Sequence, residues 1–491
     1  MHFNRIKNTK KLALAFIAIS GGFISCASPK EKTKLSPNII YILADDLGYG
    51  DLGVLGQKMI KTPHLNELAS EGMLFTQHYS GSAVCGPSRA VLLSGQHTGH
   101  TAIRGNKAFK GIGVAPLDPK IPTLPETIKN NTNYTTAMCG RWHLGGELSD
   151  QTPFHRGFDY HFGKLSSDYG NKFGVMIDTL WDDKGNHISY EQYSRIQVEP
   201  MYENGKLFNL SETEKSMRPI NMDELVTDKA IRFIQKEKDQ PYFLYVAYSL
   251  VHSPMEYHSK YPVENTEWPE EERAFASMLM ALDDYVGKIV KTVDELGQSD
   301  NTIIIFTSDN GAHNEGHDVE FFNSNGDFKE YKRSFYDGGL HSPMVVRWPG
   351  VVEPNTKSNH ISAFWDVMPT LCDIAGAPKP EHTDGISFLP TLLGEEQPKH
   401  EYLYWEFDEN IYKRKNNYKQ AVRKGDWKGI YYIDEDKFEL YNLKQDISET
   451  NELSAQHPEI VKEMKTIMTE AHVPNERFPL LKEERLVNKT K

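Results

Sequence analysis

Four mostly apolar runs predict strands; the run at 133–139 is a short candidate, and the other three are nearly continuous and predict burial on both faces. The four runs cover residues 38–44, 133–139, 241–248 and 302–307. A strand with one solvated face would instead alternate between apolar and polar positions. Segments with a helical repeat lie between these runs, for example residues 222–236 and 271–295. Strands that alternate with helices predict an α/β fold, with a large, mostly parallel sheet sandwiched by helices.

The pattern changes near residue 380, where the predicted strands become shorter and follow one another closely. They cover residues 420–423, 427–432 and 438–443, and a helix is predicted over residues 458–471. Strands joined by short connections pair in an antiparallel way. We therefore expect a large α/β domain over residues 37–378 and a smaller C-terminal α+β domain over residues 379–491.

The first 25 residues are typical of an export signal. A basic segment precedes an apolar stretch over residues 12–24, which is too short to span a bilayer. This stretch ends in Phe-Ile-Ser-Cys, which resembles a bacterial lipobox. Such a site predicts lipidation of Cys26 and anchoring in the bacterial cell envelope, in the periplasm or at the outer membrane or cell surface. A plain secretory signal is the alternative. Residues 26–36 then form a polar tether.

Composition and charge narrow the classes of partner. A net charge of −13 argues against nucleic-acid binding and against general binding to anionic membranes, so membrane contact is expected only through the lipid anchor. An anionic substrate would need positive charge concentrated at one site. Four cysteines are too few for a disulfide framework.

Polar and ionisable residues follow each of the four buried strands. Asp45 and Asp46 come directly after the first run, and Asp309 and Asn310 follow the fourth. Adjacent carboxylates beside a buried strand are costly unless a cation or hydrogen bonds compensate them, so a metal site is favoured over a turn with helix-capping aspartates. In parallel sheets, ligands bind beyond the carboxyl ends of the strands. We therefore expect an active site at this edge.

Cys85 lies at the start of a predicted helix. Pro87 suits the first turn of that helix and Gly95 its end. The free N–H groups and the positive dipole end of a helix N-terminus favour anions. A buried thiol and a phosphatase nucleophile are alternatives, but the phosphatase loop spaces its cysteine and arginine by five residues, whereas three separate Cys85 from Arg89.

The sequence Cys-x-Pro-Ser-Arg, followed by Leu-x-Ser-Gly, resembles the signature of the formylglycine-dependent (type I) sulfatases of the alkaline-phosphatase-like superfamily. Residues 38–53, 157–160, 308–311 and 439–453 resemble further segments of that family, so the likeness covers almost the whole mature chain. It implies an alkaline-phosphatase-like fold. It also implies that a formylglycine-generating maturase oxidises Cys85 to formylglycine, whose aldehyde hydrate is the nucleophile.

The resemblance also implies a metal site. Asp45, Asp46, Asp309 and Asn310 would hold one divalent cation, usually Ca²⁺, which the formylglycine made from Cys85 would face. Carboxylate and amide oxygens are the ligands that a hard cation prefers, so the chemistry of the residues agrees with the family pattern.

The resemblance to this family also implies roles for other residues of the site. Asp309 would help to activate the nucleophile, and Arg89 would hold it together with the metal carboxylates. His252 would give a proton to the leaving alcohol, and Lys332 would pair with sulfate oxygens. His143 would act as the base that leads to release of the enzyme-bound sulfate.

One position departs from the family pattern, and one further histidine is a candidate. Arg141 stands where the family usually has lysine; arginine keeps the positive charge but cannot act as an acid near neutral pH, so we expect it to contact sulfate or formylglycine. His313 follows the metal pair and is a candidate substrate contact, with a structural loop histidine as the alternative.

These observations predict a sulfuric ester hydrolase that acts on sulfated carbohydrate, a poly- or oligosaccharide. Algal polymers such as ulvan or carrageenan are slightly favoured, and host glycosaminoglycans are the alternative. A phosphomonoesterase or phosphonate monoester hydrolase of the same superfamily is the first alternative. An inactive protein that binds sulfated glycans is the second. Loops such as residues 165–216 would select the sugar, and their composition carries no code for it.

Overall fold

The computed structural model describes residues 36–109, 113–146, 150–165, 180–181, 187–188, 201–208, 222–408 and 418–489. Residues 36–491 form one compact unit. The predicted export signal, Cys26 and all of the tether except Ser36 lie outside the described residues, as does most of the loop at 165–216. Within the described part of the chain, no helix is long and apolar enough to cross a membrane.

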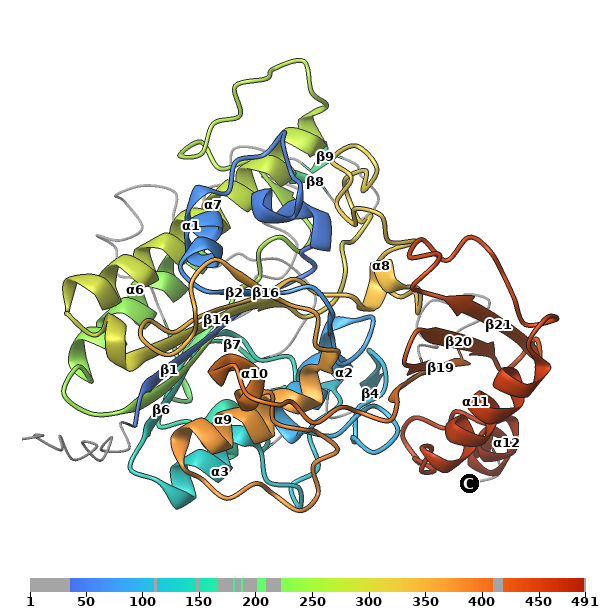
Figure 1. Ribbon diagram of the computed structural model, residues 1–491. Helices are drawn as coiled ribbons and strands as arrows, with labels where there is room; N and C mark the ends of the chain where they lie inside the picture. The colour runs from blue at the N-terminus through green and yellow to red at the C-terminus, as the bar shows by residue number, and fades with distance from the viewer. Residues whose placement is uncertain are drawn as a thin grey trace, which may run out of the picture. The chain divides into compact units, whose positions relative to one another are not determined.

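A ten-stranded sheet forms the centre of the large domain (Figure 1). Its middle strands β7, β6, β12, β1 and β14 are parallel, and the strands that flank them pair antiparallel to them. In sheet order the strands are β11 (Lys206–Leu207), β10 (Met201–Glu203), β7 (Tyr160–Lys164), β6 (Thr135–Arg141), β12 (Tyr242–Ala247), β1 (Asn38–Ala44), β14 (Thr302–Ser308), β15 (Met344–Arg347), β2 (Met73–Phe75) and β16 (Thr356–Ser358). The four apolar runs are the strands β6, β12, β1 and β14, and the predicted fold class is confirmed.

Each central strand contributes to two hydrophobic cores. In β1, Ile39, Tyr41 and Leu43 pack on one side of the sheet, whereas Ile40 and Ile42 pack on the other. All of these side chains are buried. Burial on both faces explains why the sequence of β1 lacks the alternation of a half-exposed strand.

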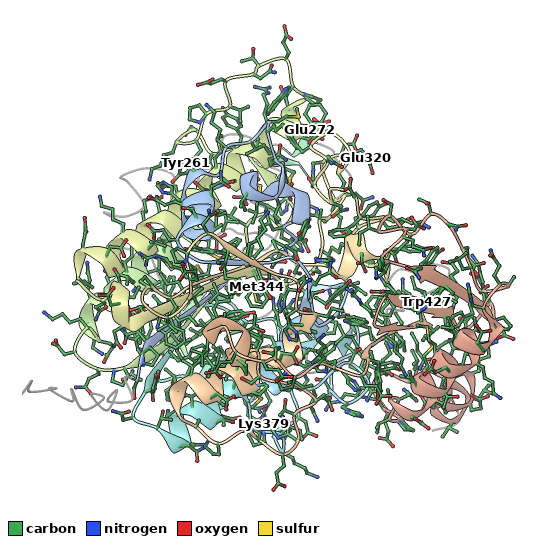
Figure 2. The ribbon with its side chains drawn as sticks, in the orientation of Figure 1. Tyr261, Glu272, Glu320, Met344, Lys379 and Trp427 are labelled. Carbon is green, nitrogen blue, oxygen red and sulfur yellow. The ribbon has the colours of Figure 1, made fainter. Side chains whose placement is uncertain are left out.

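Helices cover both faces of the sheet, as Figure 1 shows. One face carries α1 (Pro63–Ser70), α6 (Met222–Lys236) and α7 (Glu270–Glu295), and the other carries α2 (Cys85–Ser94), α3 (Leu124–Asn131) and α9 (Val367–Ala375). Two shorter helices are α8 (Asp337–Leu340) and α10 (Leu389–Leu393). Figure 2 marks Met344 of β15 among the side chains that fill this interior.

Small sheets complete the large domain. They are formed by β3 (His78–Tyr79) with β17 (Ser362–Ala363), by β4 (Ala108–Phe109) with β5 (Gly113–Val114), and by β13 (Met255–Glu256) with β8 (Leu180–Trp181) and β9 (His187–Ile188).

The C-terminal part contains a four-stranded antiparallel sheet. Its strands are β18 (Leu403–Asp408), β19 (Tyr418–Lys424), β20 (Trp427–Tyr432) and β21 (Lys437–Asn442), accompanied by the helices α11 (Pro458–Glu470) and α12 (Lys482–Lys489). The sequence did not predict β18, which alternates between two cores. Leu403, Trp405 and Phe407 join the core of the large domain, whereas Tyr404 packs with α11. The domain boundary at residue 378 stays a prediction.

Candidate active site

Cys85 is the first residue of α2, and Gly95 ends this helix in the left-handed conformation with a φ of 66°. The thiol is almost fully buried, and burial raises its pKa to about 12, helped by the nearby carboxylates Asp45 and Asp309. A phosphatase nucleophile must instead be a thiolate near neutral pH. The unmodified thiol is therefore in the wrong state for that alternative.

The three predicted metal carboxylates lie together. β1 and β14 are parallel neighbours, and Ala44 is level with Ser308, so the residues that follow them meet at one edge. One oxygen from each of Asp45, Asp46 and Asp309 lies within 4.8 Å of the others, and all three residues are fully buried. These carboxylates repel one another and need compensation.

Arg89 bridges two of the carboxylates from α2. Its Nη2 atom lies 2.9 Å from Asp45 Oδ2 and 2.8 Å from Asp309 Oδ2, and its Nε donates to the same Asp309 oxygen at 3.0 Å. Burial alone would raise the pKa of Asp45, but Arg141 and Arg89 hold it at about 2. Burial and the charge of Asp45 raise the pKa of Asp309 to about 7. Arg89 thus compensates part of the negative charge of both carboxylates.

The oxygen atoms of this cluster fit a hard divalent cation. Asp45 Oδ1 and Asn310 Oδ1 are buried and have no hydrogen-bond partner among the described residues. Asn310 Nδ2 donates to Asp46 Oδ1 at 2.7 Å, which turns the amide oxygen away from that carboxylate. A buried polar atom without a partner is costly. A cation that prefers oxygen ligands would use both of these unpaired oxygens.

Two further cations reach the cluster from other elements. Lys332, in the loop before α8, donates from Nζ to Asp46 Oδ2 at 2.7 Å. Arg141, the last residue of β6, pairs with Asp45. Lys332 and Arg141 are only 4% and 3% exposed. Cations are therefore concentrated at this edge of an acidic protein, as an anionic substrate requires.

His252 and His143 both lie beside the cluster. The Nε2 atom of His252 is 3.6 Å from Asp46 Oδ2, and its Nδ1 donates to the backbone oxygen of Ser253 at 2.6 Å. A Cβ atom added at Gly86 would lie 3.7 Å from His143 Cε1, so His143 is beside the start of α2. Burial and the cations Arg141 and Arg89 hold the pKa of His143 well below its usual value, so its ring is neutral.

Two residues of the site have a strained backbone. Asp46 and His143 have φ angles of 63° and 61°, a left-handed conformation that non-glycine residues rarely adopt. Such strain persists where the surrounding structure imposes it, and it is frequent at functional sites.

His313 is held inside the protein. Its Nε2 donates to the backbone oxygen of Val251 at 3.0 Å, and its Nδ1 accepts from the backbone N–H of Glu315 at 3.1 Å. Both ring nitrogens are thus engaged, and the side chain is fully buried. This geometry favours the structural alternative, and a substrate contact by His313 stays a prediction.

Sequence reasoning missed two polar residues at the site. Asn106 Nδ2 lies 3.7 Å from Cys85 Sγ, and Glu315 Oε2 lies 3.5 Å from Lys332 Nζ. Neither residue follows a buried strand, so the pattern that located the other residues could not find them. The nearness of Glu315 to Asp309 and Asn310 in the sequence was the one available signal.

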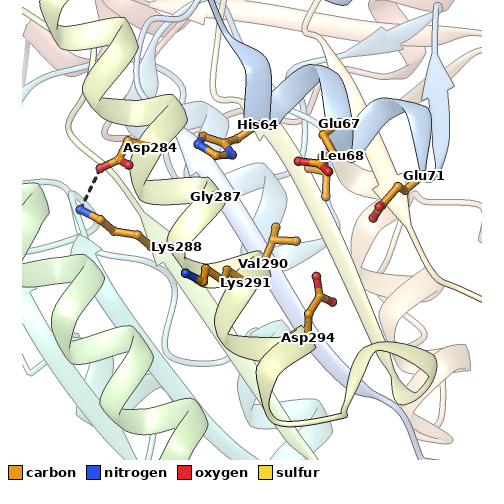
Figure 3. A pocket seen from close by; sticks show the side chains of 10 residues that line it. All are labelled: His64, Glu67, Leu68, Glu71, Asp284, Gly287, Lys288, Val290, Lys291 and Asp294. Carbon is orange, nitrogen blue, oxygen red and sulfur yellow. Dashed lines mark ion pairs between the residues drawn. The ribbon is translucent and has the colours of Figure 1, made fainter.

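An open groove of about 500 Å³ lies elsewhere, between α1 and α7 (Figure 3). Side chains of the two helices face each other across it, and Lys288 pairs with Asp284 at 2.8 Å. It is lined by His64, Glu67, Leu68, Glu71, Asp284, Gly287, Lys288, Val290, Lys291 and Asp294. None of the predicted site residues lines this groove, so it is distinct from the cluster around Cys85.

Comparison with known proteins identifies the family. The sulfatase family matches residues 37–377, and the C-terminal domain of N-sulphoglucosamine sulphohydrolase matches residues 326–473. An N-acetylgalactosamine-6-O-sulfatase of Bacteroides thetaiotaomicron is 29% identical over 88% of this chain and 92% of its own. The N-acetylgalactosamine-6-sulfatase of Homo sapiens is 32% identical over 73% of this chain and 66% of its own.

Solved structures agree with this assignment. Ps i-CgsB in complex with k-i-k-neocarrahexaose has a TM-score of 0.75 and 26% identity, with 92% of this chain and 97% of that chain covered. The phosphonate monoester hydrolase of Agrobacterium radiobacter shares the fold, with a TM-score of 0.65, 20% identity, and coverage of 89% of this chain and 95% of its own. The chain therefore belongs to the sulfatase family of the alkaline-phosphatase-like superfamily and is a sulfuric ester hydrolase.

Proposed function

We propose that this enzyme removes sulfate from sulfated carbohydrates, with Cys85 converted to formylglycine by a maturase and with Ca²⁺ held by Asp45, Asp46, Asp309 and Asn310. The observation that carries the proposal is the cluster of buried carboxylates that meets the start of α2, where Arg89 bridges two of them. Formylglycine hydrate would supply a hydroxyl nucleophile, and the cation would supply Lewis-acid stabilisation of negative charge.

The positively charged side chains of the site would bind and orient the sulfate group. Lys332 and Arg141 already lie against Asp46 and Asp45, so their charges are fixed before a substrate arrives. Arg89 holds Asp45 and Asp309 in place through its own hydrogen bonds. Charges held in a buried site stabilise an anionic transition state because they need not reorganise during the reaction.

Two histidines would move protons. His252 Nδ1 donates to the backbone of Ser253, so Nε2 is the atom left for the leaving alcohol, and it lies near Asp46. His143 is neutral near physiological pH, as a base must be before it accepts a proton, and it lies beside the start of α2.

The carbohydrate class is supported by relatives and neighbours. One relative is an N-acetylgalactosamine-6-O-sulfatase, and one solved structure is bound to a neocarrahexaose. We propose a poly- or oligosaccharide substrate, with algal polymers such as ulvan included. The predicted signal over residues 1–25 would export the enzyme, and lipidation of Cys26 would anchor it in the cell envelope.

Paired aryl substrates test this function. The enzyme produced with a maturase should hydrolyse an aryl sulfate faster than the matching aryl phosphate or phosphonate monoester. Mass spectrometry of the peptide that contains residue 85 should show conversion of the thiol to the aldehyde. A preference for phosphate would support the phosphomonoesterase or phosphonate monoester hydrolase alternative. Binding of sulfated glycans without turnover would support the inactive binding protein. A desulfation screen on defined sulfated oligosaccharides then identifies the sugar.

A further inference from the structure

Asn106 reaches Cys85 from a loop that the proposed mechanism does not use. This loop connects α2 to β4, and Asn106 lies 21 positions after Cys85. Its Nδ2 atom is 3.7 Å from Cys85 Sγ, and its Oδ1 accepts a hydrogen bond from the backbone N–H of Gly86 at 3.2 Å. The side chain thus spans the first two residues of the helix that begins at Cys85.

The orientation of the Asn106 amide follows from this contact. A backbone N–H can only donate, so the atom that faces Gly86 must be the carbonyl oxygen. The NH₂ group is therefore turned towards residue 85. The approach is close: a Cβ atom added at Gly86 would lie 2.4 Å from Asn106 Oδ1. Glycine at position 86 makes room for this amide.

Charged residues hold the loop on both sides of Asn106. Arg104 Nη1 lies 2.5 Å from Glu406 Oε1, and Lys107 pairs with Asp408. Glu406 and Asp408 both belong to β18 and are fully buried. The backbone oxygen of Arg104 also accepts from the N–H of Asp408 at 3.0 Å. Two ion pairs and a backbone hydrogen bond to β18 thus hold the loop on both sides of Asn106.

The surroundings of Asn106 indicate what it would bind. Its NH₂ group lies at the same helix start where the anionic group of the substrate is expected, and the side chain is only partly buried, so it is open to a ligand. An amide donor there adds a directed hydrogen bond to the charges of Lys332 and Arg141. Donors aimed at developing charge are a large source of rate enhancement in enzymes.

We propose that Asn106 is a further catalytic residue, whose NH₂ group donates a hydrogen bond to an oxygen of the sulfate group bound beside residue 85. This inference rests on the proposed function. It assigns to the loop after α2 a direct part in sulfate recognition, and to the Arg104–Glu406 and Lys107–Asp408 pairs the task of positioning it.

Sulfate binding to protein that cannot be converted tests the inference without relying on turnover. In the Cys85→Ala variant, which cannot form formylglycine, calorimetry measures the affinity of the site for inorganic sulfate without any turnover. Adding Asn106→Asp keeps an acceptor for the Gly86 N–H but turns a carboxylate towards the anion, so affinity should fall by more than tenfold. Adding Asn106→Ala removes the donor, and affinity should fall by about tenfold, the scale of one hydrogen bond to a charged group. Gln96→Ala, beyond the other end of α2, is the matched control and should change nothing.

The same substitutions in converted enzyme should lower kcat/KM on an aryl sulfate by about tenfold or more, with conversion of Cys85 unchanged by mass spectrometry. Thermal unfolding shows whether each variant is folded. If a variant is not folded, Asn106→Ser is measured in its place. Unchanged sulfate affinity together with unchanged kcat/KM in Asn106→Asp would overturn the inference. Failure of the proposed function looks different: the Cys85→Ala protein would not bind sulfate at all, or Lys332→Ala would keep full activity.

Discussion

Two clusters of buried carboxylates in this protein are compensated in different ways. At the ends of β1 and β14, oxygens of Asp45, Asp46 and Asp309 lie within 4.8 Å of one another. Where α8 meets the C-terminal sheet, Asp337 and Glu449 both pair with Lys428, whose Nζ is 2.5 Å and 3.0 Å from their oxygens. Lys428, Asp337 and Glu449 are fully buried. Both clusters thus contain a cation between two carboxylates, Arg89 in the first and Lys428 in the second, and they differ in the oxygens that these cations leave over.

The second cluster is also closed by hydrogen bonds. The Tyr79 hydroxyl donates to Asp337 Oδ2 at 2.8 Å, and the Asp337 backbone N–H donates to Glu449 Oε2 at 2.6 Å. In the first cluster, Asp45 Oδ1 and Asn310 Oδ1 have no hydrogen-bond partner among the described residues; Glu449 Oε1 has none either, but it lies 3.0 Å from Lys428 Nζ. The open oxygens of the first cluster can serve a ligand, whereas the carboxylates of the second are engaged by Lys428 and by hydrogen bonds and act as a structural joint.

The largest expected effect is on turnover at the open cluster. Cys85→Ala removes the atom that conversion requires, so activity should fall by at least ~10⁴-fold, as expected for loss of a nucleophile. Kinetics on an aryl sulfate measure this, and thermal unfolding should stay close to wild type because the open cluster itself is intact. Cys372→Ala, another buried thiol, is the control and should remain active. Turnover by Cys85→Ala would remove the nucleophile assignment.

Disruption of the second cluster, formed by Lys428, Asp337 and Glu449, should lower the stability of the protein. Lys428→Met leaves Asp337 and Glu449 buried without their cation, so the free energy of unfolding should fall by about 3–5 kcal/mol. Urea denaturation measures the loss. Combining Lys428→Met with Asp337→Asn and Glu449→Gln removes the uncompensated charges and should recover part of the stability. Equal stability of wild type and Lys428→Met would show that this cluster is not a structural joint.

An added cation should distinguish the two clusters. At a concentration 100 times its Kd, Ca²⁺ should stabilise the folded protein by about 2.7 kcal/mol, because it binds the folded state alone. Chelation should remove both this gain and the activity. The gain should vanish in Asp45→Asn and persist in Lys428→Met, which leaves the open cluster unchanged. A Ca²⁺-dependent shift in melting temperature that survives in Asp45→Asn would contradict the assigned ligands.

The smallest effect concerns two further carboxylates, Glu406 and Glu484, which the titratable ring of His472 joins. His472 Nδ1 lies 2.7 Å from Glu406 Oε2, and its Nε2 lies 2.8 Å from Glu484 Oε1. Burial opposes the charged ring, but Glu406 and Glu484 outweigh it and raise the pKa of His472 above its usual value.

A histidine whose pKa is raised on folding stabilises the protein fully below its unfolded pKa, near 6.5, and loses that contribution as the pH rises through the folded pKa. Unfolding free energy should therefore fall by about 1 kcal/mol across that interval. His472→Gln should flatten this part of the pH profile. The same pH dependence in wild type and His472→Gln would assign the titration to another group.

Long-range contacts explain why sequence analysis found some residues of the site and not others. Asp45, Asp309, Arg141 and His252 follow buried strands, and parallel strands bring their carboxyl ends to one edge, so the fold class was enough to group them. Asn106 comes from a loop whose path depends on ion pairs with β18, about 300 positions away. No periodic pattern in the sequence encodes such a pairing.

Apolar periodicity and short motifs are local properties of the chain, so they were enough to predict the buried strands, the helix that begins at Cys85 and the family. Long-range packing places β18 in the main core, turns Asn106 towards residue 85, and sets Lys428 between the carboxylates of one cluster while oxygens of another stay open. The physical reason is that the environment of a buried charge depends on which distant segments pack around it, and this is set only when the whole chain folds.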